Sequence, residues 1–128
     1  MILPYLYMAM VEGKGRAMFS RRDIAANTVI EIAPVIVMPY HERLLLDKTA
    51  LHNYIFEWGY KKDMCCMALG YIPIYNHSYS SNCEYEMDYD KDIITVKSVR
   101  GIPKGEEITI NYNGVWNDTK KIWFDVIE

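Results

Sequence analysis

The sequence lacks the cysteine spacing of a structural zinc site. Its three cysteines are Cys65, Cys66 and Cys83, and none of them forms a Cys-x-x-Cys pair. Zinc sites in small domains commonly use such pairs, so we expect no bound metal. Adjacent cysteines rarely bridge each other, and the odd count also argues against a disulfide framework. The pattern favours buried free thiols in a reducing compartment.

Long apolar runs and an excess of positive charge are also absent. No run approaches the roughly 20 apolar residues that a membrane span needs. The apolar segment 1–11 lacks the basic start and the cleavage site of a signal peptide and is typical of a first strand. The net charge of -3 argues against generic nucleic-acid binding, because phosphate contacts need clustered Lys and Arg. We expect a soluble intracellular protein with no membrane partner and no direct nucleic-acid partner.

Helix signals are scarce, whereas short strand patterns are frequent. The 128 residues are enough for one domain with a core of its own. Only segment 41–51 predicts a helix, with Leu44, Leu45 and Leu51 able to share a face. Pro34 interrupts the β-branched segment 29–38, which predicts two short strands meeting at a corner. Further strands are predicted from apolar and alternating patterns at 54–58, 83–88, 93–99 and 106–112. The fold class is therefore mainly β with few helices.

The chain is organised around segment 67–88. An apolar run ends in the polar triplet Asn76-His77-Ser78, after which the residue types alternate strictly. The two-residue period of a strand separates two faces. One face carries Glu84, Glu86 and Asp88, and the other carries Cys83, Tyr85 and Met87. The triplet is either a turn whose side chains satisfy backbone donors or a site where backbone groups are exposed.

A glycine-rich loop follows the first predicted strand. Gly13 and Gly15 permit positive φ angles and let a backbone approach a ligand closely. The alternative is a simple hairpin turn. A dinucleotide-binding fingerprint is excluded, because no third glycine follows and no helix opens.

Four segments in this order resemble the SET domain of protein-lysine methyltransferases. They are Gly13-Lys14-Gly15-Arg16, Tyr54, Asn76-His77-Ser78 with Asn82-Cys83, and Gly105-Glu106-Glu107-Ile108-Thr109-Ile110-Asn111-Tyr112. Each segment alone is weak evidence, but the ordered set is specific. The resemblance covers about 8–114 of a single SET domain at 1–128, with an aromatic tail at 115–128. It is closest to the minimal stand-alone SET proteins of bacteria and large algal viruses. It implies a β-clip fold of several small sheets with a C-terminal pseudoknot.

The resemblance also implies S-adenosylmethionine as the methyl donor, with S-adenosylhomocysteine as the product. The implied cofactor-binding residues are Gly13, Lys14, Gly15 and Arg16 at the methionine part, Asn76 at its amino-acid end and His77 at the adenine. Tyr112 would be the catalytic tyrosine, and Tyr85 and Tyr54 would line the channel of the target lysine. The chain has eleven tyrosines, most of which are explained by ordinary packing. Tyr112 is the exception, because it follows the Glu107-Ile108-Thr109 motif at the family's spacing.

These residue types suit methyl transfer to an amine. Transfer is an in-line displacement, so alignment of the two bound partners supplies much of the acceleration. The nucleophile is the neutral amine, whereas free lysine has a pKa of about 10.4. A narrow aromatic channel disfavours the ammonium form. Tyrosine hydroxyls orient the amine without adding positive charge.

The sequence departs from the zinc-dependent members of the family. Those members carry a cysteine directly after Asn-His-Ser, where this chain has Tyr79, and a cysteine cluster beyond the catalytic strand. We therefore expect the aromatic tail with Trp116, Trp123 and Phe124 to cover the cofactor instead, and we count Trp116 among the cofactor-binding residues.

The acidic strip Glu84, Glu86 and Asp88 suggests a substrate class. It is either a solvated strand face or a landing surface for a basic histone, histone-like or ribosomal protein. Two alternatives to an enzyme remain, namely a catalytically silent SET-like module that binds a peptide or ligand, and a small β-clip domain that binds carbohydrate. A homodimer is open for so small a domain, although no stretch demonstrates it.

Overall fold

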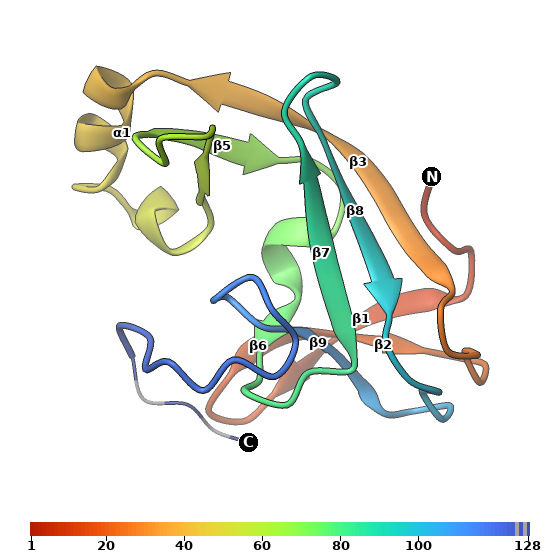
Figure 1. The fold of residues 1–128 in the computed structure, drawn as a ribbon. Helices are drawn as coiled ribbons and strands as arrows, with labels where there is room; N and C mark the ends of the chain where they lie inside the picture. Colours follow the sequence, from red (N-terminus) through yellow and green to blue (C-terminus); the bar gives the residue numbers. More distant parts are fainter. Residues whose placement is uncertain (125, 127) are drawn as a thin grey trace.

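The computed structural model describes residues 1–124, 126 and 128, which form two β-sheets and three short helical segments (Figure 1). The four-stranded sheet has the order β1 (Leu6–Val11), β2 (Gly15–Ser20), β9 (Glu107–Ile110), β6 (Asn76–His77). The five-stranded sheet has the order β4 (Phe56–Trp58), β5 (Met64–Ala68), β3 (Val29–Met38), β8 (Ile93–Ser98), β7 (Cys83–Asp88). The helical segments are α1 (Tyr40–Leu46), η1 (Ala50–Asn53) and η2 (Ile72–Ile74). The predicted mainly β fold of several small sheets is confirmed.

One buried core joins the two sheets. Met18 and Ile108 come from the four-stranded sheet, Ile30 and Ile94 come from the five-stranded sheet, and all four are fully buried. The three cysteines are buried and free, which confirms the role predicted for them. In the described part of the chain, no helix has the length and apolar character needed to cross a membrane.

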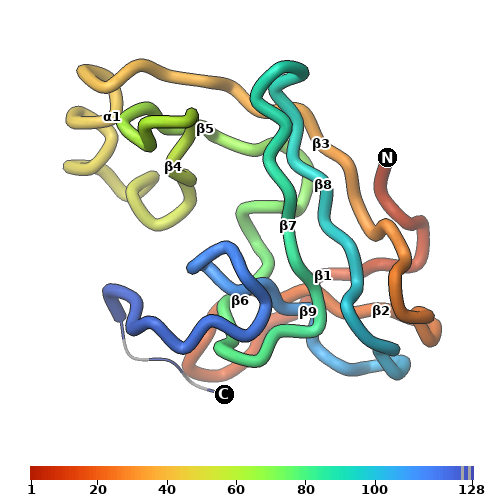
Figure 2. Tube along the Cα trace, in the orientation of Figure 1, coloured from red at the N-terminus to blue at the C-terminus, as the bar shows by residue number. Residues whose placement is uncertain are grey.

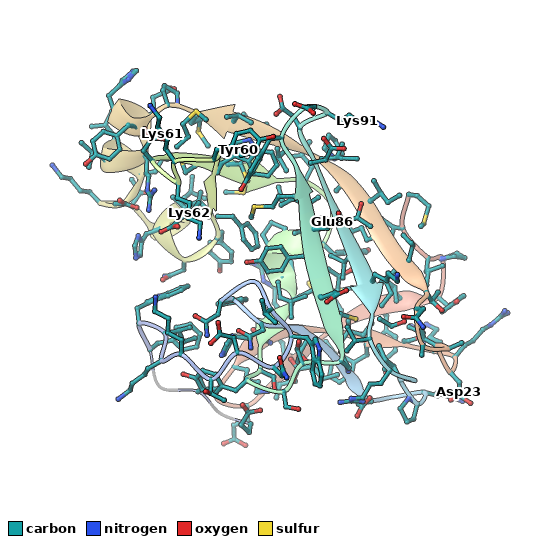
Figure 3. The ribbon with its side chains drawn as sticks, viewed as in Figure 1. Asp23, Tyr60, Lys61, Lys62, Glu86 and Lys91 are labelled. Carbon is teal, nitrogen blue, oxygen red and sulfur yellow. The ribbon has the colours of Figure 1, made fainter. Side chains whose placement is uncertain are left out.

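Strand β7 confirms the alternation predicted for 83–88. Cys83 is buried, whereas Glu84 and Glu86 are exposed. Its six residues pair antiparallel with β8, which alternates in the same way. Figure 3 shows Glu86 on β7, with Lys91 at the turn that leads into β8.

Strand β3 corrects the corner predicted at Pro34. The segment is one continuous strand of ten residues. Val29–Pro34 pairs with β8, and Val35–Met38 pairs with β5 on the other side. Pro34 lies where the pairing partner changes. Its missing N–H therefore removes no necessary ladder hydrogen bond, and the chain does not have to turn there.

The helix predicted for 41–51 is also corrected. α1 ends at Leu46, and Thr49 begins the separate segment η1 by accepting a hydrogen bond from the Leu51 N–H. Leu44 and Leu45 are exposed, so the shared buried face does not form. The strand predicted from residue 54 begins only at Phe56, because Tyr54 is the C-cap of η1.

Strands β6 and β9 bring two distant segments of the chain together. They pair in parallel, with Asn76 opposite Thr109 and His77 opposite Ile110, and Figure 2 shows them side by side. The buried Asn82 side chain fastens the pair from outside the ladder. Its Oδ1 accepts a hydrogen bond from the Thr109 N–H at 2.9 Å, and its Nδ2 donates to the backbone oxygen of the residue at 107 at 2.7 Å. This junction places the polar triplet next to the end of β9.

Candidate active site

Two cavities meet beside the end of β9. The larger cavity has a volume of about 540 Å³, and the smaller one has a volume of about 300 Å³. Both are lined by the same five residues, namely Asn53, Tyr54, Pro73, Tyr112 and Trp123. A ligand in either cavity would therefore contact the same tyrosine, Tyr112, from one side or the other.

The glycine-rich loop forms one wall of the larger cavity. It is both a hairpin turn between β1 and β2 and a cavity lining, so the two interpretations of this loop are compatible. Gly15 has a φ of 83°, and no heavy atom beyond its neighbours lies within 4 Å of the position where a Cβ would stand. The backbone here is open to a ligand. Arg16 lines the same wall and is exposed.

A carboxylate joins this loop to strand β6. Glu107 accepts a hydrogen bond from the Lys14 Nζ at 2.9 Å and another from the Asn76 Nδ2 at 2.9 Å. Asn76 also donates to the Arg16 carbonyl at 3.0 Å. The side chains of the Lys14–Glu107 pair are only 14% and 16% exposed, so this pair is screened less than a surface pair. The network holds the loop and Asn76 in a fixed relation.

His77 forms the floor between the cavity and the core. It is 3% exposed, and its Nδ1 accepts a hydrogen bond from the Tyr112 N–H at 2.9 Å. Burial lowers the pKa of His77, although the charge of Glu128 works in the opposite direction. The imidazole is therefore neutral at physiological pH. Its Nε2 is buried and has no hydrogen-bond partner among the described residues.

The two tyrosines at the junction of the cavities are held as neutral hydroxyls. The Tyr112 hydroxyl donates to the Tyr75 carbonyl at 2.9 Å, and the Tyr85 hydroxyl donates to the Tyr112 carbonyl at 3.4 Å. Burial raises the pKa of Tyr112 and that of Tyr85 to about 12. Neither side chain is a tyrosinate at neutral pH, so neither can act as a base there.

The smaller cavity is largely aromatic. The rings of Phe56 and Tyr85 meet edge to face with centroids 5.6 Å apart. The other aromatic lining residues are Tyr54, Tyr89, Tyr112 and Trp123. Lys62, from the turn between β4 and β5 that Figure 3 labels together with Tyr60 and Lys61, lies in the lining as well. Such a cavity suits an extended side chain with an apolar stem.

The structure brings nearly all of the predicted site residues together. The larger cavity is lined by Gly13, Lys14, Gly15, Arg16, Asn76, His77 and Tyr112, and Tyr85 lines the smaller one, while Tyr54 lines both. Trp116 lines neither cavity, and its contact with the cofactor stays a prediction. Its carbonyl accepts hydrogen bonds from the Ser81 N–H and hydroxyl, which hold it beside the start of β7. Trp123 and Phe124, which the sequence analysis names with Trp116 as the aromatic cover, line the larger cavity.

Several lining residues were not predicted as site residues, among them Asn53, Pro73 and Ile74. Pro73 and Ile74 stand directly before the polar triplet, so their proximity in sequence was a usable signal. Asn53 ends η1 and carries no signal in the sequence, because only the fold of the segment 50–53 turns it toward both cavities.

Comparison with known proteins bears on this geometry. The model of the SET domain family matches residues 15–113. The histone-lysine N-methyltransferase of Schizosaccharomyces pombe that is specific for H3 lysine-37 is 30% identical over 115 residues, which are 89% of this chain and 73% of that protein. A crystal structure from Plasmodium falciparum, of a protein assigned to the histone methyltransferases, has a TM-score of 0.65 at 26% identity and covers 90% of this chain and 98% of its own. Polycomb Repressive Complex 2 of Chaetomium thermophilum has a TM-score of 0.69 at 16% identity, over 84% of this chain and 14% of its own, which shows the fold alone.

Proposed function

This chain belongs to the SET-domain family and is a protein-lysine methyltransferase, and we propose that it transfers a methyl group from S-adenosylmethionine to the ε-amino group of a lysine in a basic protein. The observation that carries the proposal is the meeting of the two cavities at Tyr112, which lines both. In-line transfer needs a donor and an acceptor that approach one point from two sides.

The larger cavity fits the cofactor. Its volume of about 540 Å³ lies within the usual range of small-molecule sites. Arg16 offers an exposed cation to the carboxylate of an amino acid, and the open backbone at Gly15 allows close approach. The buried Nε2 of His77 is a polar atom that lacks a partner among the described residues. When bound, S-adenosylmethionine supplies a methyl group activated by the neighbouring sulfonium.

The smaller cavity fits the acceptor lysine. Its aromatic walls disfavour the ammonium form of the amine, so the proton leaves to solvent before transfer. Tyr85 and Tyr112 cannot take this proton, because raised pKa values of about 12 keep each hydroxyl protonated. Their role is to orient the amine through hydrogen bonds.

We infer a basic substrate from the charge of β7. Glu84 and Glu86 are exposed on one face of this edge strand. The Asp88 carboxylate has a second role in the turn, since its Oδ1 accepts hydrogen bonds from the N–H groups of residues 90 and 91. The yeast relative is named for a lysine of histone H3, which supports a histone-like substrate. A substrate KM that is unchanged by salt and by Glu86→Lys would contradict this landing surface.

The test is transfer of labelled methyl groups from S-adenosylmethionine to core histones and to a whole-cell protein extract. We expect labelling of a discrete lysine and a fall of about 10²-fold in kcat for Tyr112→Phe, which removes one orienting hydroxyl. Tyr7→Phe is the matched control. Its ring stacks on Phe19 outside both cavities, so kcat should be unchanged.

The alternative outcomes separate two other functions. Cofactor binding by calorimetry without labelling of any protein would favour a catalytically silent binding module. Absence of cofactor binding would overturn the proposal for the larger cavity.

A further inference from the structure

A buried carboxylate lies behind the site. Glu31 on β3 is 0% exposed and is the only buried acid among the described residues. Burial raises the pKa of this carboxyl group. A buried acid costs stability unless hydrogen bonds satisfy it. Neither cavity is lined by Glu31, so the direct chemistry of the site does not account for it.

Both oxygens of Glu31 are hydrogen-bonded to the residues that flank η2. Oε1 accepts from the Tyr75 hydroxyl at 2.7 Å, and Oε2 accepts from the Tyr71 N–H at 2.9 Å. Gly70 makes room for this approach, because a Cβ at its position would collide with Oε2 of Glu31. The carboxylate thus holds η2 at its first and last flanking residues.

The same turn carries the acceptor of the Tyr112 hydroxyl. Tyr75 is 0% exposed, and its carbonyl oxygen accepts from the Tyr112 hydroxyl at 2.9 Å. Two hydrogen bonds therefore link Glu31 to Tyr112 through the covalent frame of Tyr75, one at its side-chain hydroxyl and the other at its backbone carbonyl. The orientation of the Tyr112 hydroxyl depends on where this carbonyl stands.

We propose that Glu31 is a positioning residue for methyl transfer, because it fixes the Tyr75 carbonyl that orients the Tyr112 hydroxyl. The inference rests on the proposed function. A displacement of about 1 Å in a reacting geometry can cost about 10²-fold in rate. The residue acts through its two hydrogen bonds rather than through its charge.

Substitution by glutamine separates the hydrogen bonds from the charge. The side-chain oxygen of glutamine accepts from the Tyr71 N–H, and its amide N–H donates to the Tyr75 hydroxyl oxygen, so both links survive. Glu31→Ala removes both links. Tyr75→Phe removes one link and keeps the ring and the carbonyl.

The first experiment measures kcat and KM per folded molecule. We expect kcat to fall about 10-fold in Tyr75→Phe and by up to about 10²-fold in Glu31→Ala, with Glu31→Gln within about threefold of wild type. The calorimetric Kd for S-adenosylmethionine should stay within about twofold, because Glu31 holds η2, which supplies only Pro73 and Ile74 to the larger cavity, and not the glycine-rich loop with Arg16. Ser98→Ala is the control. Ser98 lies on β8 outside both cavities, and its fully buried hydroxyl is hydrogen-bonded to the Thr28 N–H and the Ala25 carbonyl. Removing this hydroxyl should lower Tm without changing kcat.

A second readout needs no turnover. With ¹³C-labelled tyrosine, the Cζ resonance of Tyr112 is identified by its loss in Tyr112→Phe. It should move in Tyr75→Phe and Glu31→Ala, and it should stay in place in Glu31→Gln and Ser98→Ala. An unchanged kcat in Tyr75→Phe, or an unmoved resonance, would overturn the proposal. If the wild-type protein methylates nothing, the proposed function is wrong. The Cζ resonance of Tyr112 would still show whether Glu31 positions the Tyr112 hydroxyl. If Glu31→Ala does not fold, the other two variants decide.

Discussion

The two walls of the larger cavity are built differently. The inner wall consists of Asn76 and His77 from β6 and of Tyr112 just beyond β9, and His77 is only 3% exposed. The outer wall consists of Trp123 and Phe124 from the tail, which are 59% and 42% exposed. The inner wall belongs to the folded core, whereas the outer wall adds little buried area of its own. The proposed chemistry thus lies on the part of the molecule that folding holds in position.

The walls meet at two residues of the inner wall. The Tyr112 ring stacks on Trp123 with centroids 5.7 Å apart, and His77 meets Phe124 edge to face at 6.5 Å. Glu128 adds a polar contact, since its carboxylate accepts from the Ser78 hydroxyl at 2.7 Å. A bound cofactor would enlarge the apolar contact of the outer wall. We therefore expect the outer wall to contribute more to binding than to stability.

The largest expected effect comes from Asn82, which holds β9 behind the inner wall. Asn82→Ala should lower the free energy of unfolding by about 3 kcal/mol, because the buried Thr109 N–H and the carbonyl at 107 lose their partner. Asn113→Ala is the control. Its Nδ2 donates to the carbonyl at 120 at 2.6 Å in an exposed setting, and its loss should cost less than about 1 kcal/mol. Urea denaturation measures both. Equal losses of unfolding free energy in Asn82→Ala and Asn113→Ala would contradict the difference between the walls.

The next effect concerns the outer wall. Trp123→Ala should raise the Kd for S-adenosylmethionine about tenfold, equal to about 1.4 kcal/mol, because one aromatic cover of the cavity is lost. The free energy of unfolding should change by less than about 0.5 kcal/mol, since the side chain is largely exposed. Trp116→Ala removes the same side chain away from both cavities and should leave the Kd unchanged. A larger effect at Trp116 than at Trp123 would contradict this assignment of the outer wall.

The inner wall was largely predictable from the sequence because its signals are local. The strict alternation of 83–88 predicts which side of β7 carries Tyr85, whereas the first two residues of the Asn-His-Ser triplet, predicted to lie outside regular structure, form the strand β6. The role proposed for Tyr112 comes from a motif that ends at this residue, and the structure places Tyr112 in the lining of both cavities. The exact partners did not follow, because the pairing of β6 with β9 joins segments far apart in the chain.

The remaining features depend on tertiary contacts that no local pattern encodes. Pro34 predicted a corner, but a change of pairing partner accommodates the missing N–H without one. Trp116 and Trp123 are equivalent in an aperiodic tail, and only the hydrogen bonds of Ser81 to the Trp116 carbonyl separate them. Glu31 stands in an apolar segment of the sequence. Its two hydrogen-bond donors cannot be predicted from that segment, because they belong to the residues around η2.

The smallest effect tests His77, where the two walls meet. Burial lowers the pKa of His77 below its ordinary value of 6.5, so the folded state favours the neutral ring. Below pH 6.5 the unfolded chain binds this proton more readily, and stability is lost as the pH falls toward the folded pKa. Protonation would also cost the hydrogen bond that Nδ1 accepts from the Tyr112 N–H. We expect the Tm of wild type to fall between pH 7 and pH 5 more steeply than that of His77→Gln. His41→Gln, at an exposed position on α1, should keep the wild-type slope. If His77→Gln also kept the wild-type slope of Tm against pH, His77 would not be a neutral buried histidine at the junction of the walls. The hydrogen bond that its Nδ1 accepts from the Tyr112 N–H would then have to be reassigned.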